Sequence, residues 1–258
     1  ANAQGKHIVT VEGVNMDKLS PVQQAMVDES GTQCGFCTPG FVVSLSGCCL
    51  SSGKIDANAA LRCIDGNICR CTGYKSIERA TVTVAQQLAR KDTKDPIGWS
   101  IKNGFLPAHF EGIKERLQAI TTEVKVLSDK AIITVAGGTD LYVQKHDTMH
   151  HSAVRSLAKE TELKGIRFEG DQCIIGGAAT AADLLNSAEL KKFFPRLEQY
   201  LLLVSSTPIR NMGTLAGNFV NASPIGDLTA IFLALNSTIE LNGSQAKRSL
   251  KLKDLYKG

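Results

Sequence analysis

The sequence has neither a long apolar run nor a strong excess of charge of one sign. Within its 258 residues no apolar stretch approaches the ~20 residues that a membrane-spanning helix requires. The 29 basic and 25 acidic residues leave a formal net charge of +4, which does not indicate a nucleic-acid-binding surface. We therefore expect a soluble protein with no membrane and no nucleic acid among its partners.

Several recognisable motifs are missing as well. The chain has no internal repeat, no low-complexity tract and no G-x-G-x-x-G fingerprint of a Rossmann dinucleotide site. It also has no Ser/His/Asp or Cys/His arrangement of the kind that a nucleophilic mechanism requires, so we predict no catalytic residue of that type. No cysteine or carboxylate cluster accompanies His146, His150 and His151, and we interpret them as surface histidines rather than metal ligands.

Four of the eight cysteines stand in two close pairs. Two residues separate Cys34 from Cys37, and a single residue separates Cys69 from Cys71. Four thiolates form a complete set of ligands for either an iron–sulfur cluster or zinc. The single-residue spacing counts against zinc, whose paired ligands are usually two to four residues apart. We predict an iron–sulfur cluster, and a zinc-stabilised interaction module without enzymatic activity is the alternative.

The sequence around these cysteines predicts a small bundle of helices. Ser-Pro-Val-Gln at 20–23 is a capping signature that starts a first helix. Thr38 and Pro39 open a second helix directly after Cys37, and apolar spacing predicts further helices over 58–64 and 77–90. A helix N-terminus favours a thiolate through its backbone N–H groups and its dipole, so Cys37 is well placed to act as a ligand.

The other four cysteines have a simpler interpretation. Cys48, Cys49 and Cys63 lie on apolar helical faces, and Cys173 lies in a strand-like run. Free cysteine behaves as a small hydrophobic residue, so we expect all four to be buried. A disulfide framework is not expected in a chain of this length without a visible secretory leader. We expect a reduced, cytoplasmic protein.

Two later runs are rich in glycine and small polar residues. In the first, an apolar strand over 132–136 leads into Gly137 and Gly138 and then into a predicted helix. Glycines here let backbone N–H groups converge on an anion such as a pyrophosphate. The second run, 207–227, combines Gly, Asn, Ser and Thr with small apolar residues, as suits a backbone packed against a polar ligand. Turns without any ligand are the alternative for both runs.

Together these motifs resemble the molybdenum hydroxylases, the family of xanthine dehydrogenase, aldehyde oxidase and carbon monoxide dehydrogenase. C-G-F-C-T-P-G from Cys34 and C-R-C-T-G-Y from Cys69 resemble its second [2Fe-2S] domain, and the two glycine-rich runs resemble its FAD domain. The resemblance implies an α+β fold. A helical [2Fe-2S] bundle would span 1–90, a linker 91–106, and an incomplete α/β FAD-binding domain 107–258.

The resemblance also implies which residues hold the cofactors. The cluster ligands would be Cys34, Cys37, Cys69 and Cys71. FAD would be bound by Ala136, Gly137, Gly138, Thr139, Asp140 and Leu141 of the first run, and by Thr214, Gly217, Asn218 and Asp227 of the second. Ala216 stands where the family commonly has a second glycine.

The function implied by the resemblance is electron transfer within a larger oxidoreductase. Electrons would pass from a molybdopterin centre through [2Fe-2S] to FAD and on to NAD or oxygen, and the chain would be inactive alone. The expected partners are a molybdopterin-binding subunit or domain and a second [2Fe-2S] domain of the ferredoxin type. Gln33, Gly35 and the segment 71–74 would face the molybdenum partner.

Overall fold

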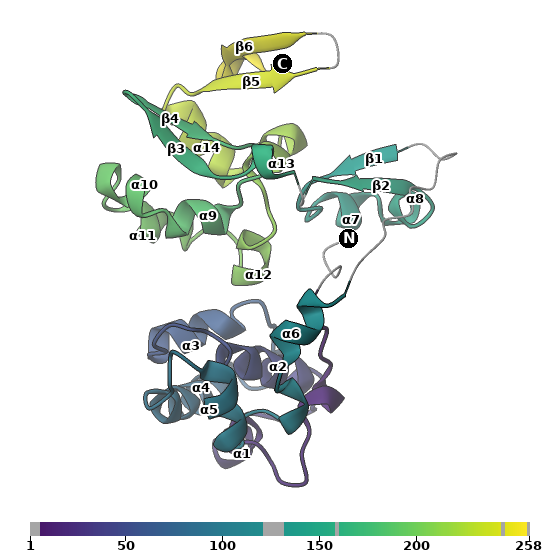
Figure 1. Cartoon of the computed structure of the whole chain (residues 1–258), viewed down its shortest axis with the longest axis vertical. Helices are drawn as coiled ribbons and strands as arrows, with labels where there is room; N and C mark the ends of the chain where they lie inside the picture. Colours follow the sequence, from purple (N-terminus) through teal and green to yellow (C-terminus); the bar gives the residue numbers. More distant parts are fainter. Residues whose placement is uncertain (1–5, 121–131, 158–159, 244–245, 257–258) are drawn as a thin grey trace. The chain divides into compact units, whose positions relative to one another are not determined.

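The computed structural model describes residues 6–120, 132–157, 160–243 and 246–256. The chain forms two compact units, Asn2–Lys125 and Val126–Gly258. The described part of the first unit contains only helices, whereas the second unit combines helices with short strands (Figure 1). This mixture agrees with the predicted α+β class. Among the described residues, no helix is both long enough and apolar enough to cross a membrane.

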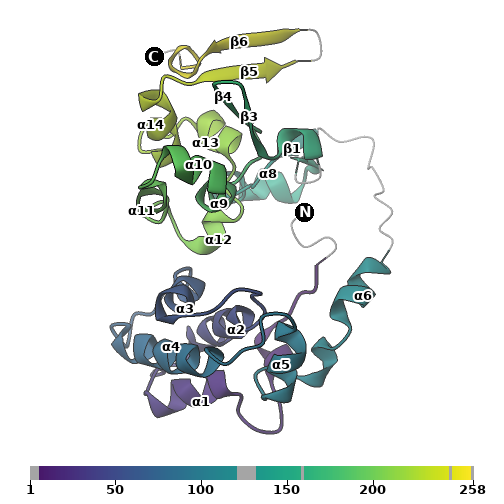
Figure 2. The ribbon, with the colours of Figure 1, turned by 60° about the vertical axis from the view of Figure 1, so that its left-hand side comes forward.

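The first unit is a bundle in which α4 packs against both α1 and α3, and α2 packs against α3 (Figure 2). Its elements are η1 (Val11–Val14), α1 (Pro21–Asp28), α2 (Thr38–Cys48), α3 (Ala57–Ile64), α4 (Lys75–Leu88), α5 (Pro96–Lys102), η2 (Ala108–Phe110) and α6 (Ile113–Gln118).

The predicted helix starts are present. The Gln23 N–H donates to Ser20 Oγ at 3.2 Å and the Ser20 N–H donates to Gln23 Oε1 at 2.8 Å, which completes the capping box of α1. Cys37 is the N-cap residue of α2, as expected. Asp56 caps α3 by accepting the Ala59 N–H at 2.7 Å.

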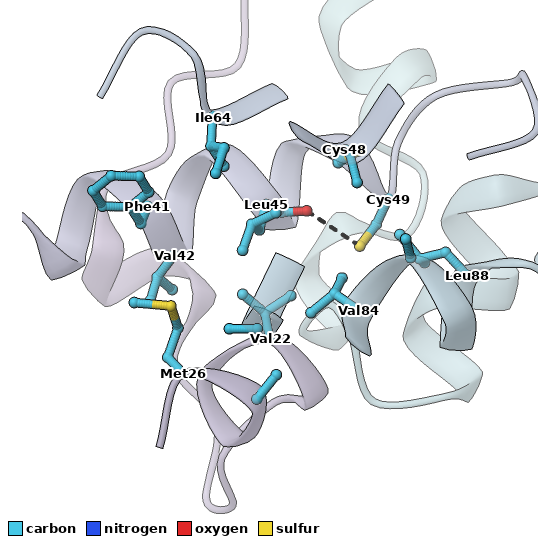
Figure 3. Close-up of a cluster of buried hydrophobic side chains, with 14 of the residues drawn as sticks. Val22, Met26, Phe41, Val42, Leu45, Cys48, Cys49, Ile64, Val84 and Leu88 are labelled. Carbon is cyan, nitrogen blue, oxygen red and sulfur yellow. Dashed lines mark hydrogen bonds between the residues drawn. The ribbon is translucent and has the colours of Figure 1, made fainter. Parts of the chain in front are cut away.

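The core of the first unit forms where α1, α2 and α4 meet (Figure 3). Val22 from α1, Leu45 from α2 and Val84 from α4 have no exposed surface. Burying an apolar side chain of this size stabilises the fold by about 1.5–3 kcal/mol. The bundle is therefore held by its apolar faces, and the loops between its helices remain available for the paired cysteines.

The stretch 91–106, expected to be a linker, contains α5. The Asp95 side chain accepts the Gly98 N–H at 3.0 Å, so Asp95 caps a helix whose first residue is Pro96. Proline is tolerated at this position because its missing N–H would have no partner inside the helix. Phe105 is buried in the core of the first unit, with Trp99 packed against it. A helix therefore begins at Pro96, inside the stretch that was expected to be a linker.

The second unit contains three two-stranded sheets and several short helices. Its elements are β1 (Ile132–Val135), α7 (Leu141–Gln144), α8 (His146–His150), β2 (Ala153–Ser156), η4 (Thr161–Leu163), β3 (Ile166–Glu169), β4 (Gln172–Ile175), α9 (Ala181–Asn186), α10 (Ala188–Phe193), α11 (Leu197–Leu201), α12 (Thr207–Arg210), α13 (Leu215–Asn221), α14 (Asp227–Ala234), β5 (Thr238–Asn242), β6 (Lys247–Lys251) and η5 (Leu252–Asp254).

The sheets differ in direction. β1 and β2 are parallel, with Ile132 opposite Ala153, whereas β3–β4 and β5–β6 are antiparallel pairs. A second apolar core joins α9 to α11, α13 and α14, with Leu184, Leu201 and Leu228 buried at its centre. This core fixes the helices that carry the second glycine-rich run.

Burial was predicted correctly for two of the four remaining cysteines. Cys48 and Cys49 are buried, and Cys63 is partly buried. The prediction for Cys173 was wrong, because its side chain is exposed on β4. Among the described strands, β4 pairs with β3 alone, so the apolar run around Cys173 belongs to a two-stranded ribbon.

Candidate cofactor sites

The four paired cysteines leave two loops of the helical bundle. Cys34 and Cys37 precede α2, and Cys69 and Cys71 lie between α3 and α4. Cys71 Sγ donates to Cys34 Sγ at 3.4 Å, and Cys37 donates to Cys69. The structure therefore brings together cysteines that are more than thirty positions apart. They form two sulfur pairs, and each pair joins one cysteine of the first loop to one cysteine of the second.

Tight turns give the two loops their shape. Gly35 has a φ of 82° and Gly73 a φ of 60°, both in the left-handed region that favours glycine. Tyr74, directly after Gly73, also has a positive φ of 67°. Its hydroxyl accepts the Cys69 N–H at 3.2 Å, which folds the Cys69 loop back onto the start of α4.

Hydrogen bonds to sulfur prepare two of the thiols for ionisation. Hydrogen bonds from the Thr72 side chain and backbone lower the pKa of Cys69 to about 7. The Thr72 N–H lies 3.5 Å from Cys69 Sγ. A hydrogen bond from the Phe36 N–H lowers the pKa of Cys34 in the same way. Thiolates are the form that binds iron or zinc, and N–H donors to sulfur are typical of iron–sulfur sites.

Cys37 does not follow the expectation drawn from its place at a helix start. Burial raises its pKa, and the hydrogen bond that it donates to Cys69 adds to the effect. Removal of the sulfur from water and its role as a donor therefore outweigh the favourable end of α2. The pKa of Cys71 is also raised, because its thiol donates a hydrogen bond to Cys34.

Four thiols that leave two loops are the donor set of a [2Fe-2S] cluster, in which four thiolates are shared between two irons. Cys34 and Cys71 are exposed, which leaves one side of the site open to an incoming group.

The glycine loop of the second unit follows β1 as predicted. Gly137 and Gly138 lie between β1 and α7, and Gly138 has a φ of 75°. Among backbone hydrogen bonds of the described residues, the N–H groups of Gly137, Gly138 and Thr139 are not donors. Three successive N–H groups without a carbonyl partner form a suitable cradle for a pyrophosphate.

The two glycine-rich runs are in contact. A Cβ on Gly137 would overlap the Met212 carbonyl, so this position admits only glycine without a shift of backbone. A Cβ on Gly213 would lie 3.8 Å from Thr139 Oγ1. The close approach of these backbones places the start of the second run beside the cradle.

The predicted residues of the second run have structural partners. Thr214 caps α13 by accepting the Gly217 N–H at 3.2 Å. Asn218 Oδ1 accepts from the N–H and the hydroxyl of Thr229, at 2.9 and 2.8 Å, and so ties α13 to α14. Asp227 is exposed at the first position of α14. Asn218 thus directs its carbonyl oxygen to the protein itself, while Asp227 faces solvent.

Arg210 is a residue of this run that the sequence interpretation did not single out. Its side chain is buried and donates to the carbonyls of Val204 and Ser205, at 2.9 and 2.5 Å, and to Thr207 Oγ1 at 2.7 Å. A guanidinium has five donors in a fixed fork and can hold several carbonyls at once. The sequence signal that could have pointed to Arg210 is an arginine followed by a loop rich in small residues.

Comparison with known families identifies both domains. Residues 10–82 match a family described as a [2Fe-2S] binding domain. Residues 113–258 match the FAD binding domain in molybdopterin dehydrogenase. The chain belongs to the molybdopterin dehydrogenase family. It carries the [2Fe-2S]-binding and FAD-binding domains of a molybdenum hydroxylase, and the zinc-module alternative is not supported.

Relatives of this molybdopterin dehydrogenase chain are large enzymes. It is 25% identical to xanthine dehydrogenase of Emericella nidulans over 98% of the chain and 23% of that protein. It is 24% identical to xanthine dehydrogenase/oxidase of Rattus norvegicus over 95% of the chain and 22% of that protein. CO dehydrogenase from Oligotropha carboxidovorans is 30% identical, with a TM-score of 0.45 over 49% of this chain and 45% of that chain. The chain spans about a quarter of the length of the curated relatives it matches.

Proposed function

We propose that this chain relays electrons in a xanthine dehydrogenase-like molybdenum hydroxylase, from a molybdopterin centre through [2Fe-2S] to FAD and on to NAD or oxygen. The observation that supports it most is the pair of sites in one chain, four cysteines joined as two sulfur pairs and a glycine cradle after β1. The curated relatives named above are enzymes of this type.

The residues proposed to hold the cluster are Cys34, Cys37, Cys69 and Cys71. When bound, the cluster supplies a one-electron carrier, and FAD supplies a group that exchanges electrons singly or in pairs. Cys69 and Cys34 offer the sulfurs that ionise most readily, and the N–H groups of Thr72 and Phe36 already point at them. These hydrogen bonds stabilise negative charge on the sulfurs without requiring the loops to move.

The residues proposed to hold FAD lie on both glycine-rich runs. The backbone of Ala136 to Leu141 would bind the pyrophosphate and ribityl side, and its three N–H groups without carbonyl partners are the observation that supports this. Thr214 and Gly217 would complete the site next to the cradle. Asn218 and Asp227 are proposed to act from the α13 and α14 side, where the Thr229 contact holds the Asn218 amide in one orientation.

A partner surface is proposed around the exposed edge of the cluster loops. Phe36 is 93% exposed between two of the ligands, and Ile68, just before Cys69, is 73% exposed. Ile68 also lines a hollow of 340 Å³, together with Phe41 and Tyr74 among others. Exposed apolar side chains grouped in this way are typical of interaction surfaces. We propose that a molybdopterin-binding domain or subunit covers this surface.

The other proposed partner is a ferredoxin-like domain with a second [2Fe-2S] cluster, which the relay would need to carry electrons toward FAD. We further propose that the protein works in the cytoplasm, since the structure describes all eight cysteines without a disulfide and reducing compartments keep cysteines reduced.

The test is the cofactor content of the chain purified without oxygen from iron-replete cells. We expect two irons and two acid-labile sulfides per chain, a visible absorption band from the cluster, and FAD released on denaturation. Zinc sites are colourless, so a colourless protein with stoichiometric zinc and no iron would overturn the proposal. Substrate hydroxylation by the isolated chain would contradict its role as a relay.

A further inference from the structure

A second group of cysteines lies in the first unit, away from the cluster loops. Cys48 at the end of α2 and Cys63 on α3 are hydrogen-bonded through their sulfurs, with Sγ–Sγ 2.7 Å, although they are 15 positions apart in the sequence. A disulfide has an S–S length of about 2.0 Å. The two sulfurs therefore need to approach by only about 0.7 Å to form one.

The two sulfurs differ in access to solvent. Cys63 is partly exposed, whereas Cys48 is buried. The hydrogen bond that they share lowers the pKa of Cys63, with a further contribution from Arg62. The same hydrogen bond, together with burial, raises the pKa of Cys48. Cys63 is thus the thiol that reagents reach and that ionises first, and Cys48 is the neighbour able to attack it from inside the core.

Two further residues complete the group. Lys91 is buried and donates through Nζ to the Ser51 carbonyl, close to the end of α2, and its charge favours the thiolate of both Cys48 and Cys63. Cys49 has a different partner and donates through Sγ to the Leu45 carbonyl at 3.6 Å (Figure 3). The geometry therefore selects Cys48, and not its sequence neighbour, as the partner of Cys63.

We propose that Cys48 and Cys63 are a redox-reversible pair that forms a disulfide between α2 and α3 when the protein meets a small-molecule disulfide of the glutathione type. This site is separate from the cluster cysteines, and it does not depend on the cluster or on FAD. The bond joins the helix that begins at Cys37 to the helix that ends just before the Cys69 loop.

The reaction balances as two thiol–disulfide exchanges. The Cys63 thiolate attacks one sulfur of oxidised glutathione, and one glutathione thiolate leaves. Cys48 then attacks the Cys63 sulfur, loses its proton to the solvent, and displaces the second glutathione as a thiolate. The protein loses two electrons and two protons, and the glutathione disulfide takes up the two electrons. A dithiol reductant reverses both steps.

The experiment treats the whole chain, purified without oxygen, with oxidised glutathione, blocks the remaining thiols and maps the peptides. Cleavage before Asp56 and Asp65 isolates Cys63 from Cys69, and chymotryptic cleavage after Phe41 separates Cys48 from Cys34 and Cys37. We expect most of the chains to contain a Cys48–Cys63 link that dithiothreitol removes. Fragmentation of the linked peptide distinguishes Cys48 from Cys49. Any links among the cluster cysteines appear as separate peptides.

Single variants provide a second measurement. Cys48→Ser should leave glutathione attached to Cys63, Cys63→Ser should abolish both products, and Cys49→Ser should behave as the unchanged chain does. The oxidised chain should also unfold at a temperature about 5–10 °C higher than the reduced chain, since the link closes a loop in the unfolded state. A link through Cys49, glutathione retained on Cys63 of the unchanged chain, or two unreacted thiols would each overturn the proposal.

Discussion

Cys71 donates a hydrogen bond to Cys34 at 3.4 Å, although 37 positions separate the two residues. The contact joins the loop before α2 to the loop before α4, so it depends on the packing of the whole helical bundle. Metal sites and small folds are coupled in this way, because binding energy at the site is also folding energy.

Replacing Cys71 by Ser should remove the cluster absorption and destabilise the first unit. The change deletes one of four proposed ligands and the hydrogen bond to Cys34. Trp99 is the single tryptophan of the chain and packs against Phe105 in this unit, so its fluorescence reports unfolding of this unit alone. Cys173→Ser, which alters an exposed cysteine of the other unit, is the matched control. An unchanged visible spectrum in Cys71→Ser would remove Cys71 from the ligand set.

Gly137→Ala and Gly138→Ala should lower the FAD content and leave the cluster spectrum intact. The first places a methyl group against the Met212 carbonyl, and the second adds a side chain at a φ of 75° beside the Tyr142 ring. Gly170→Ala is the control, because Gly170 also has a positive φ, of 58°, but has open space around it. FAD released on denaturation gives the measurement. Equal FAD in all three variants would place the pyrophosphate elsewhere.

Arg210→Ala should destabilise the second unit by about 3 kcal/mol, because it removes a buried guanidinium that donates to the Val204 and Ser205 carbonyls and to Thr207 Oγ1. Urea unfolding followed by far-ultraviolet circular dichroism should show an earlier transition, whereas Trp99 fluorescence should not change. Arg248→Ala, at an exposed position of β6, should alter the free energy of unfolding by less than about 0.5 kcal/mol. Equal effects of the two substitutions would show that the buried hydrogen bonds of Arg210 contribute little.

Stability of the first unit should fall between pH 9 and pH 12. Burial raises the pKa of Cys49 to about 12, from the 9.0 that is ordinary for a cysteine thiol. Above pH 9 the unfolded chain releases this proton while the folded chain keeps it, so ionisation favours unfolding until the folded thiol also ionises. The expected loss is about 2–4 kcal/mol. Trp99 fluorescence during urea unfolding measures it, and Cys49→Ala should show a shallower pH dependence than the unchanged chain.

Phe36→Glu should weaken binding of the molybdenum partner without loss of cluster or FAD. Phe36 is 93% exposed, so a charge there meets no other side chain of the unit but would be buried against a partner. Thr72 is a poorer choice for this test, because its hydroxyl lies 3.1 Å from Cys69 Sγ. Leu19→Glu, at a 54% exposed position before α1, serves as the control. Co-purification with a molybdopterin-binding subunit measures the effect. If both variants retained the subunit equally, the interface would lie elsewhere on the chain.

Local signals predicted the helical bundle well. The capping box at Ser20 and Gln23 and the helix start after Cys37 depend on residues within one turn, and the structure contains both. The helix that begins at Pro96, inside the stretch expected to be a linker, has the same local origin, because Asp95 caps it and proline is tolerated at the first helical position. Helix starts of this kind are determined by residues that are close together in the sequence.

Contacts between distant segments could not be predicted in the same way. The pairing of Cys34 with Cys71, rather than with Cys37, depends on how two loops meet after the helices have packed. The sequence explained the glycine at position 137 by the close approach of a phosphate. In the structure, the atom that a side chain at this position would meet first is the Met212 carbonyl oxygen. The exposure of Cys173 depends on what packs against β4, and the residues around Cys173 carry no information on that.

The two-stranded sheets have a practical consequence for handling the protein. Each described strand has one hydrogen-bonded neighbour, so within the described ranges the other edge of each strand from β1 to β6 has no strand paired to it. Such edges can pair with strands of other molecules. Concentrated samples should therefore self-associate through the second unit, and light scattering should rise with protein concentration. Lys247, Arg248 and Lys251 place positive charge on β6, so repulsion should oppose this at low ionic strength and weaken as salt is added.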